Sequence, residues 1–179
     1  MKTLFITFLL LTFYLLGEDL GYLVDDLNQS QKSFLLYDSE KINFIFDIKH
    51  KNYKNIDFFI SKHENIDFII RDNNTALFYA IDLENLKVVK LLIEHGANIY
   101  HINNNLETAL HIAVKRDSRE IVRYLLEQGI KIENKDCYGN NALFYAKENA
   151  NNEIIELLKY YKKSEIKEVD SLENFIKNF

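Results

Sequence analysis

The fold is decided by the segment TALFYAIDLENLKVVKLLIEHGANI, which occupies residues 75–99. Its opening triplet recurs in steps of 33 residues, as Thr75-Ala76-Leu77, Thr108-Ala109-Leu110 and Asn141-Ala142-Leu143. Apolar residues of the second half keep the same step, at Leu92, Leu125 and Leu158. A fixed period of about 20 to 50 residues is typical of repeat proteins, in which each unit is one supersecondary element. We therefore expect stacked units, with Leu125 in their shared core.

Each unit predicts a turn, a short helix, a longer helix and a loop. In the segment above, the first helix is expected over 76–83 and the second over 85–95, because their apolar residues recur at helical spacing. Gly96 should end the second helix, since glycine adopts the left-handed conformation without steric cost. Thr75 and Thr108 occupy positions where a hydroxyl can cap the first helix. Neither helix can bury its apolar face alone, so the units must stack.

These units resemble ankyrin repeats. The family pattern D-x-x-G-x-T-P-L-H-x-A, followed by V-V-x-x-L-L-x-x-G-A-N-I, is met closely in three places: the turn at 136–143, the helix start at 108–113 and the second helix at 88–99. The resemblance implies an all-α ankyrin-repeat solenoid of about four helix-turn-helix repeats with a C-terminal capping helix. It also implies a protein that binds another macromolecule and is not an enzyme.

Some positions depart from the family pattern. Phe78 and Phe144 replace a histidine that only His111 keeps, and we expect His111 to hydrogen-bond between repeats. Asn73 and Leu106 replace the turn glycine. Asparagine tolerates a positive φ, whereas leucine does so with difficulty. The turn around Leu106 is therefore expected to be irregular.

The repeats are expected over residues 38–163, as a degenerate unit at 38–70 and further units at 71–102, 103–135 and 136–163. The degenerate unit keeps the second-helix pattern at 55–66 and is expected to have a first helix at 42–48. Residues 18–37 predict a short helical lead-in. Residues 164–179 predict a closing helix that covers the last repeat.

The N-terminus predicts an export signal. A positively charged start precedes an uncharged, almost wholly apolar run at 3–16, so residues 1–17 are expected to form a secretory signal peptide. The run is shorter than the roughly 20 residues that span a bilayer. Leu15 occupies a position of the cleavage site where a small residue is preferred. The protein is expected to be secreted or periplasmic, and the alternative is a membrane-anchored spacer or scaffold with an uncleaved N-terminus.

Composition argues against several other classes of function. The formal net charge of −5 argues against nucleic acid as a partner. Cys137 is the only cysteine, so no intramolecular disulfide can form. The five histidines lack the spacing of metal ligands, and we expect neither a metal nor a cofactor. A Cys137–His111 pair can be drawn, but the histidine of this motif faces the repeat interior, so a nucleophilic centre is not expected.

The resemblance implies a concave binding surface made of turn tips and exposed parts of the first helices. The expected contacts are Arg71, Asp72, Asn74, Asn104, Asn105, Glu107, Lys115, Arg116, Cys137, Tyr138 and Asn140. The ends of the first helices add Asp82, Leu83, Glu148 and Asn149. This set is polar and mixed in charge, which favours a polar protein partner. Arg116 and Tyr138 are the expected hot spots, because large directional side chains dominate many interfaces.

Two further pairs of residues complete these expectations. Tyr79 and Tyr145 are expected to pack in the core, because they share the first-helix position of the apolar Ile112. Lys90 and Arg123 are expected on the exposed side of the second helices, away from the binding surface.

Overall fold

A computed structural model describes residues 29–63 and 65–163. The expected signal peptide at 1–17 and closing helix at 164–179 lie outside these residues, as does most of the lead-in. The chain divides into two compact units, Met1–Phe44 and Ile45–Phe179. Only residues 29–44 of the first unit are described, and they belong to one helix.

The described chain is built from helices, as predicted. They are α3 (Gln29–His50), α4 (Tyr53–Lys62), α5 (Ala76–Asp82), α6 (Leu86–Glu94), α7 (Ala109–Lys115), α8 (Arg119–Glu127) and α9 (Ala142–Glu148), followed by a helix at residues 152–163. The described residues contain isolated β-bridges and no strand. The all-α repeat fold is confirmed. Residues 42–48 are helical, as expected for the first helix of the degenerate unit, but they belong to α3, which begins at Gln29 and runs through residue 38, where the unit was expected to begin.

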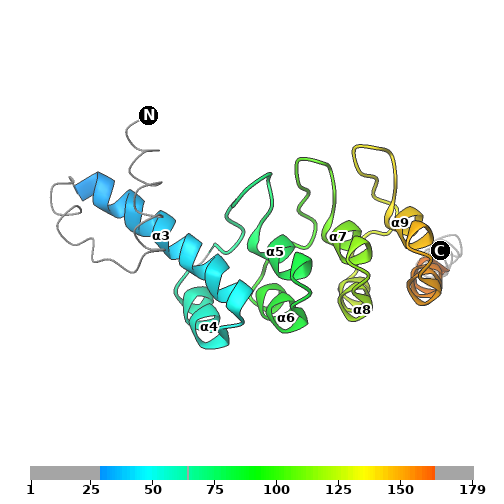
Figure 1. Ribbon diagram of the computed structural model, residues 1–179, viewed down its shortest axis with the longest axis horizontal. Helices are drawn as coiled ribbons and strands as arrows, with labels where there is room; N and C mark the ends of the chain where they lie inside the picture. The colour runs from blue at the N-terminus through cyan, green and yellow to red at the C-terminus, as the bar shows by residue number, and fades with distance from the viewer. Residues whose placement is uncertain (1–28, 64, 164–179) are drawn as a thin grey trace, which may run out of the picture. The chain divides into compact units, whose positions relative to one another are not determined.

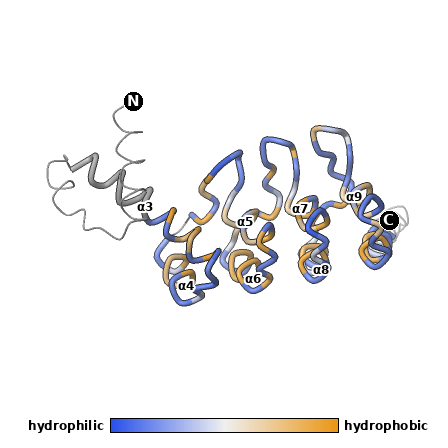
Figure 2. Tube along the Cα trace, viewed as in Figure 1, coloured by the Kyte–Doolittle hydropathy of each residue, from blue (hydrophilic) through white to orange (hydrophobic). Residues whose placement is uncertain are grey.

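Within the unit Ile45–Phe179, successive pairs of helices lie side by side (Figure 1). The first helices α5, α7 and α9 form one row, the second helices α6 and α8 lie beneath them, and the intervening loops project on the side away from the second helices. The outer parts of the projecting loops are mostly hydrophilic, whereas the helices carry most of the hydrophobic residues (Figure 2). None of the helices that the structure describes is both long and apolar enough to cross a membrane.

The core repeats with the 33-residue step seen in the sequence. Leu92 and Leu125 are fully buried and Leu158 is 1% exposed, so the expected place of Leu125 in the core is confirmed. Burying a leucine side chain contributes about 1.5–3 kcal/mol. The same three positions therefore supply a continuous apolar spine across the unit.

The first helices begin as predicted, but their caps differ. Thr108 accepts the backbone N–H of His111 and the His111 ring in turn accepts the backbone N–H of Thr108, which makes a reciprocal cap at the start of α7. Thr75 precedes α5 in the same backbone conformation, yet its hydroxyl makes no cap hydrogen bond. Phe78 stands where α7 has His111, so the ring that accepts the cap residue's N–H in the reciprocal cap is missing from α5. The capping role expected for the Thr75 side chain is wrong.

Left-handed residues recur in the loops. Gly96 follows α6 with φ +90°, which confirms its expected role at the helix end. Asn73, Leu106 and Gly139 lie 33 residues apart and have φ of 59°, 57° and 80°. The turn at Leu106 matches the turn at Gly139, in φ and in its hydrogen bond to the residue three positions earlier, so the irregular turn expected there is wrong; the turn at Asn73 differs, because Asp72 also has a positive φ of 53°. Leucine adopts the conformation at a cost of roughly 1–2 kcal/mol.

Candidate protein-binding surface

The projecting loops form three fingers, which we number by their repeat: finger 2 (residues 70–74), finger 3 (103–107) and finger 4 (136–140). Main-chain hydrogen bonds join each finger to the next. Asn104 N–H donates to the carbonyl of Asp72 at 3.1 Å, and Cys137 N–H donates to the carbonyl of Asn105 at 2.8 Å. Because the backbone itself makes these bonds, the fingers form a connected row rather than three independent loops.

Side chains at the base of two fingers fix their turns. Asp136 Oδ1 accepts the N–H groups of Tyr138 and Asn140 at 2.9 and 3.0 Å. Asn103 Oδ1 accepts the equivalent groups of Asn105 and Glu107 at 2.9 and 3.0 Å. Asp and Asn favour such turns because their short side chains reach the backbone two residues onward. The two fingers are therefore held in shape before any partner binds.

A groove of about 380 Å³ lies between fingers 2 and 3 and the helices below them. Seven of the expected contact residues line it: Arg71, Asp72, Asn74, Asp82, Asn104, Asn105 and Glu107. Its other lining residues are Phe78, Tyr79, Asn103 and Ile112. The groove thus combines polar side chains from the fingers with Phe78, Tyr79 and Ile112 of the first helices, which were not among the expected contacts.

Glu107 is not the exposed contact that the sequence suggested. Its side chain is 9% exposed, and its carboxylate accepts Asn103 Nδ2 at 2.7 Å and forms an ion pair with Lys115. Burial acts to raise the pKa of Glu107, but the hydrogen bonds from Asn103 and Lys115 outweigh it and hold that pKa below its usual value. Glu107 therefore supports the groove from below rather than offering a carboxylate to a partner.

Lys115 is also engaged within the chain. Its Nζ lies 4.0 Å from the centroid of the Tyr145 ring, which adds a cation–π contact to the ion pair with Glu107. Burial acts to lower the pKa of Lys115, but the hydrogen bond with Glu107 reverses the effect and raises it. The ammonium group therefore stays charged at neutral pH.

Arg116 reaches back to Asp82 of the preceding repeat. Its Nε and Nη2 lie 2.7 and 2.5 Å from Asp82 Oδ1, and both side chains are about half exposed. The guanidinium keeps unpaired N–H groups toward solvent, because Asp82 engages two of its five donors. Asp82 thus fixes the orientation of the Arg116 side chain, which remains half exposed and able to contact a partner.

Finger 4 presents the most exposed aromatic residue of the row. Tyr138 is 78% exposed and Cys137 beside it is exposed, whereas Asn140 is half-buried. The His111 ring contacts Thr108 through Nδ1 and the Asn140 carbonyl through Nε2, so both ring nitrogens are occupied without Cys137. These contacts also confirm the expected hydrogen bond of His111 between repeats.

Two tyrosines differ from expectation. Tyr79 is half-buried and lines the groove instead of packing wholly in the core. The Tyr145 hydroxyl donates to Asp136 Oδ2, and its ring covers Lys115. Ile112 at the equivalent repeat position predicts only apolar packing. A tyrosine at this position can pack its ring and also bind a partner through its hydroxyl.

The second-helix side carries a separate groove of about 420 Å³ between α6 and α8. Lys90 and Arg123 are exposed there as expected, and both line this groove together with Tyr124. Lys90 Nζ lies 5.2 Å from the centroid of the Tyr124 ring. Lys90 and Arg123 therefore belong to a groove on the second-helix side that is separate from the groove at the fingers.

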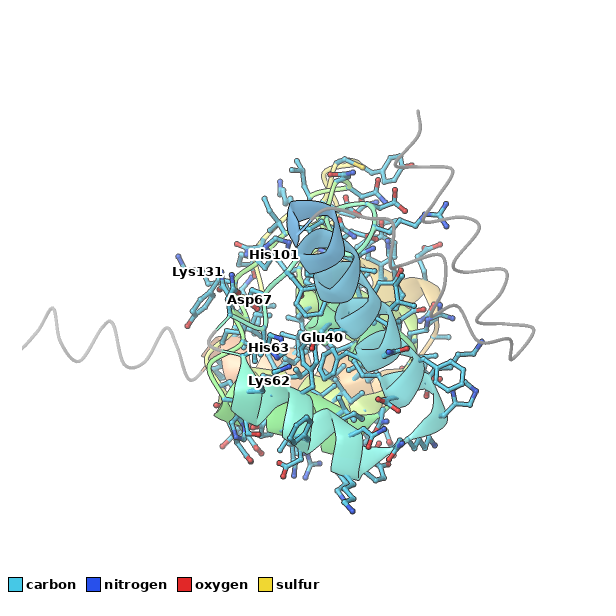
Figure 3. All side chains as sticks on the ribbon, turned by 90° about the vertical axis from the view of Figure 1, so that its left-hand side faces the viewer. Glu40, Lys62, His63, Asp67, His101 and Lys131 are labelled. Carbon is cyan, nitrogen blue, oxygen red and sulfur yellow. The ribbon has the colours of Figure 1, made fainter. Side chains whose placement is uncertain are left out.

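Hydrogen bonds between neighbouring repeats lie on another side of the stack, away from both grooves. Asp67, His101 and Lys131 lie on that side, at the left of Figure 3. Asn98 N–H donates to both carboxylate oxygens of Asp67, and the His101 ring contacts the Asn73 carbonyl at 2.7 Å. Among the residues described, no three His, Cys, Asp or Glu side chains gather as a metal site would require.

The family model described as ankyrin repeats (3 copies) matches residues 44–136 and 99–170. No curated protein matches the chain.

Proposed function

This chain belongs to the ankyrin-repeat family, and from that premise we propose that it binds a protein partner through its row of fingers and the groove beneath them. Ankyrin repeats are generally protein–protein interaction modules, and the family is typically non-catalytic. The partner would contact fingers 2 to 4 and the exposed ends of α5 and α7. The second-helix side would face solvent.

The groove between fingers 2 and 3 is the observation that carries this proposal. It brings together six residues from two separate loops with Phe78, Tyr79 and Ile112. Interfaces commonly have such a composition, with apolar and aromatic groups inside a polar rim. The fingers are joined by main-chain bonds, so binding should cost little ordering of the loops.

The charges of this surface favour a polar partner of low net charge. Asp82 is paired with Arg116, and Glu107 is paired with Lys115. Arg71 also lies 3.3 Å from Asp72, although both are well exposed. Since the ionised groups largely neutralise one another, amide and hydroxyl contacts would carry the specificity. Binding should then depend only weakly on salt concentration.

Site-specific photo-crosslinking tests the location of the interface. We expect a crosslinker at Tyr138 to capture a partner from the native compartment, while one at the 70% exposed Tyr160 on the 152–163 helix does not. Mass spectrometry identifies the captured protein, whose affinity is then measured directly. Tyr138→Ala and Arg116→Ala should each weaken binding by about 1–3 kcal/mol.

The matched control is Arg123→Ala, which removes the same side chain from the back surface. It should change affinity by no more than a few tenths of a kcal/mol, as solvated charges do. Circular dichroism should show an unchanged fold for all three variants. Strong loss in Arg123→Ala with none in Arg116→Ala would place the interface on the second helices and overturn the proposal.

We also propose that the protein is exported, on the basis of residues 1–17. A fusion of residues 1–18 to a reporter should carry the reporter across a membrane, and reporter activity confined to the cytosol would exclude this route. Mass spectrometry of the mature protein should find Glu18 at the N-terminus. An intact N-terminus on a membrane-bound protein would instead support the anchored spacer.

A further inference from the structure

The two ring nitrogens of His111 have different hydrogen-bond partners, so that one nitrogen must accept a hydrogen bond and the other must donate one. It is 1% exposed on α7. Nδ1 lies 3.1 Å from the backbone N of Thr108 and 2.8 Å from the Thr108 hydroxyl, while Nε2 lies 3.2 Å from the Asn140 carbonyl in finger 4. A backbone N–H can only donate and a carbonyl can only accept. Nδ1 must therefore be unprotonated and Nε2 must carry the hydrogen, which specifies one neutral tautomer.

Several ionisable groups face this ring from the elements around it. Lys115 comes from α7 itself, Glu107 from finger 3, Asp136 from finger 4, and the Tyr145 ring from α9 lies 6.3 Å away, centroid to centroid. Burial lowers the pKa of His111. The Asn140 carbonyl and the carboxylate of Asp136 oppose this and Lys115 adds to it, and the outcome is a pKa below the usual value.

The neighbouring repeats supply a natural comparison. Phe78 in α5 and Phe144 in α9 occupy the same repeat position as His111. The fold therefore accepts an aromatic ring that cannot titrate at this point. Of these three repeat positions, only the one between fingers 3 and 4 carries an ionisable ring.

We propose that His111 is an acid-sensitive latch that holds finger 4 against the start of α7. A proton added to Nδ1 would point at the backbone N–H of Thr108, so two donors would face each other where a hydrogen bond had been. The ring could relieve this only by moving, and its bond to the Asn140 carbonyl would move with it. Acid would thus loosen the start of α7 and finger 4 together, and, if finger 4 binds the partner as proposed above, would promote release.

The direction of the pH effect follows from proton linkage. In the unfolded chain the imidazole has the ordinary pKa of about 6.5, and in the folded chain its pKa is lower. The stabilising effect of the latch is complete above about pH 6.5 and is lost as the pH falls through the folded pKa. Below that window both states are protonated and no further loss arises from this group.

Two measurements on the full chain test the latch without any partner. At pH 7.5, 15N NMR of the ring should report hydrogen on Nε2 and none on Nδ1. Amide hydrogen exchange, expressed as protection factors at pH 7.5 and pH 5.0, should show a selective fall at residues 108–112 and 136–140. That fall should be at most about tenfold for each pKa unit by which folding lowers the pKa of His111.

His111→Phe is the control, because the same residue occurs in the two neighbouring repeats. Its protection factors at these residues should not respond to pH. If His111→Phe fails to fold, His111→Gln replaces it, since an amide can offer an acceptor and a donor without titrating. An equal fall in the folded control and the wild type, no fall in either, or a hydrogen on Nδ1 at pH 7.5 would each overturn the latch. Failure to find a partner would leave these measurements unaffected.

Discussion

Thr75 and Thr108 occupy the same position one repeat apart but have opposite surroundings. Both are buried, and both precede a first helix in extended backbone. The Thr108 hydroxyl lies 2.8 Å from His111 Nδ1, whereas the Thr75 hydroxyl has no hydrogen-bond partner among the described residues. Valine keeps the branched shape of threonine and replaces the hydroxyl by a methyl group. Thr75→Val and Thr108→Val therefore compare the same chemical change with and without a hydrogen bond.

The two variants should change the free energy of unfolding in different directions. Thr108→Val leaves His111 Nδ1 without one donor and the His111 N–H without its cap, which should cost about 1–3 kcal/mol. Thr75→Val removes a hydroxyl that lost its water on folding and gained no bond. Its removal should be neutral or should stabilise the protein by up to about 1–3 kcal/mol. The variants should therefore differ by at least about 1 kcal/mol.

Urea unfolding followed by circular dichroism at pH 7.5 measures this difference, at a pH where the lowered pKa of His111 keeps its ring neutral. Midpoints are comparable only if the slope of the transition is unchanged, because a changed slope reports a different surface exposed on unfolding. Equal destabilisation by Thr75→Val and Thr108→Val, at equal slope, would refute this reasoning. It would mean that the Thr108 hydroxyl contributes no more to stability than the Thr75 hydroxyl, although only Thr108 has His111 as a partner.

Three further substitutions probe the core, a finger and the surface. Leu125→Ala should lower the free energy of unfolding by about 2–5 kcal/mol by leaving a cavity, and a thermal midpoint within error of the wild type would contradict the core assignment. Leu106→Gly should raise the urea midpoint, by up to about 1 kcal/mol in stability, because glycine removes the steric cost of a φ of 57°. Arg116→Ala should change stability by less than about 1 kcal/mol, since its ion pair with Asp82 is half exposed; a larger loss in urea unfolding would mean that its effect on binding is indirect.

The fold was predictable because one period governs both the apolar and the turn residues. Leu92, Leu125 and Leu158 share a step, and burial at that step follows from stacking. Left-handed φ at Leu106 was not predictable from the residue itself, since leucine disfavours it. Its counterpart Gly139 carried the signal: the finger imposes its conformation on whatever residue occupies this position. The long helix α3 was missed because the degenerate unit lacks the turn residues that mark a helix start.

The candidate site was predictable in its location but not in its detail. The fingers supplied six of the groove residues from the sequence pattern alone. The burial of Glu107 escaped notice because it depends on Asn103 and Lys115 closing around it from both sides. The polar role of Tyr145 does not follow from the repeat pattern, because Asp136, which accepts its hydroxyl, lies nine residues earlier in the finger.

The side-chain bonds between repeats have a consequence for how the chain could lengthen or shorten. Arg116 bonds Asp82 and Arg119 bonds Glu153, each across a separation of 34 residues. Excising residues 103–135 would preserve the apolar spine, because its step is the same everywhere. Asp82 would then face Asn149, and Glu153 would face Leu86. The buried leucine positions are the same in each repeat, whereas the charged pairs between neighbouring repeats differ. The core would therefore fit the repeats in any order, but only the native order forms these charged pairs, which disfavours a stack in another order.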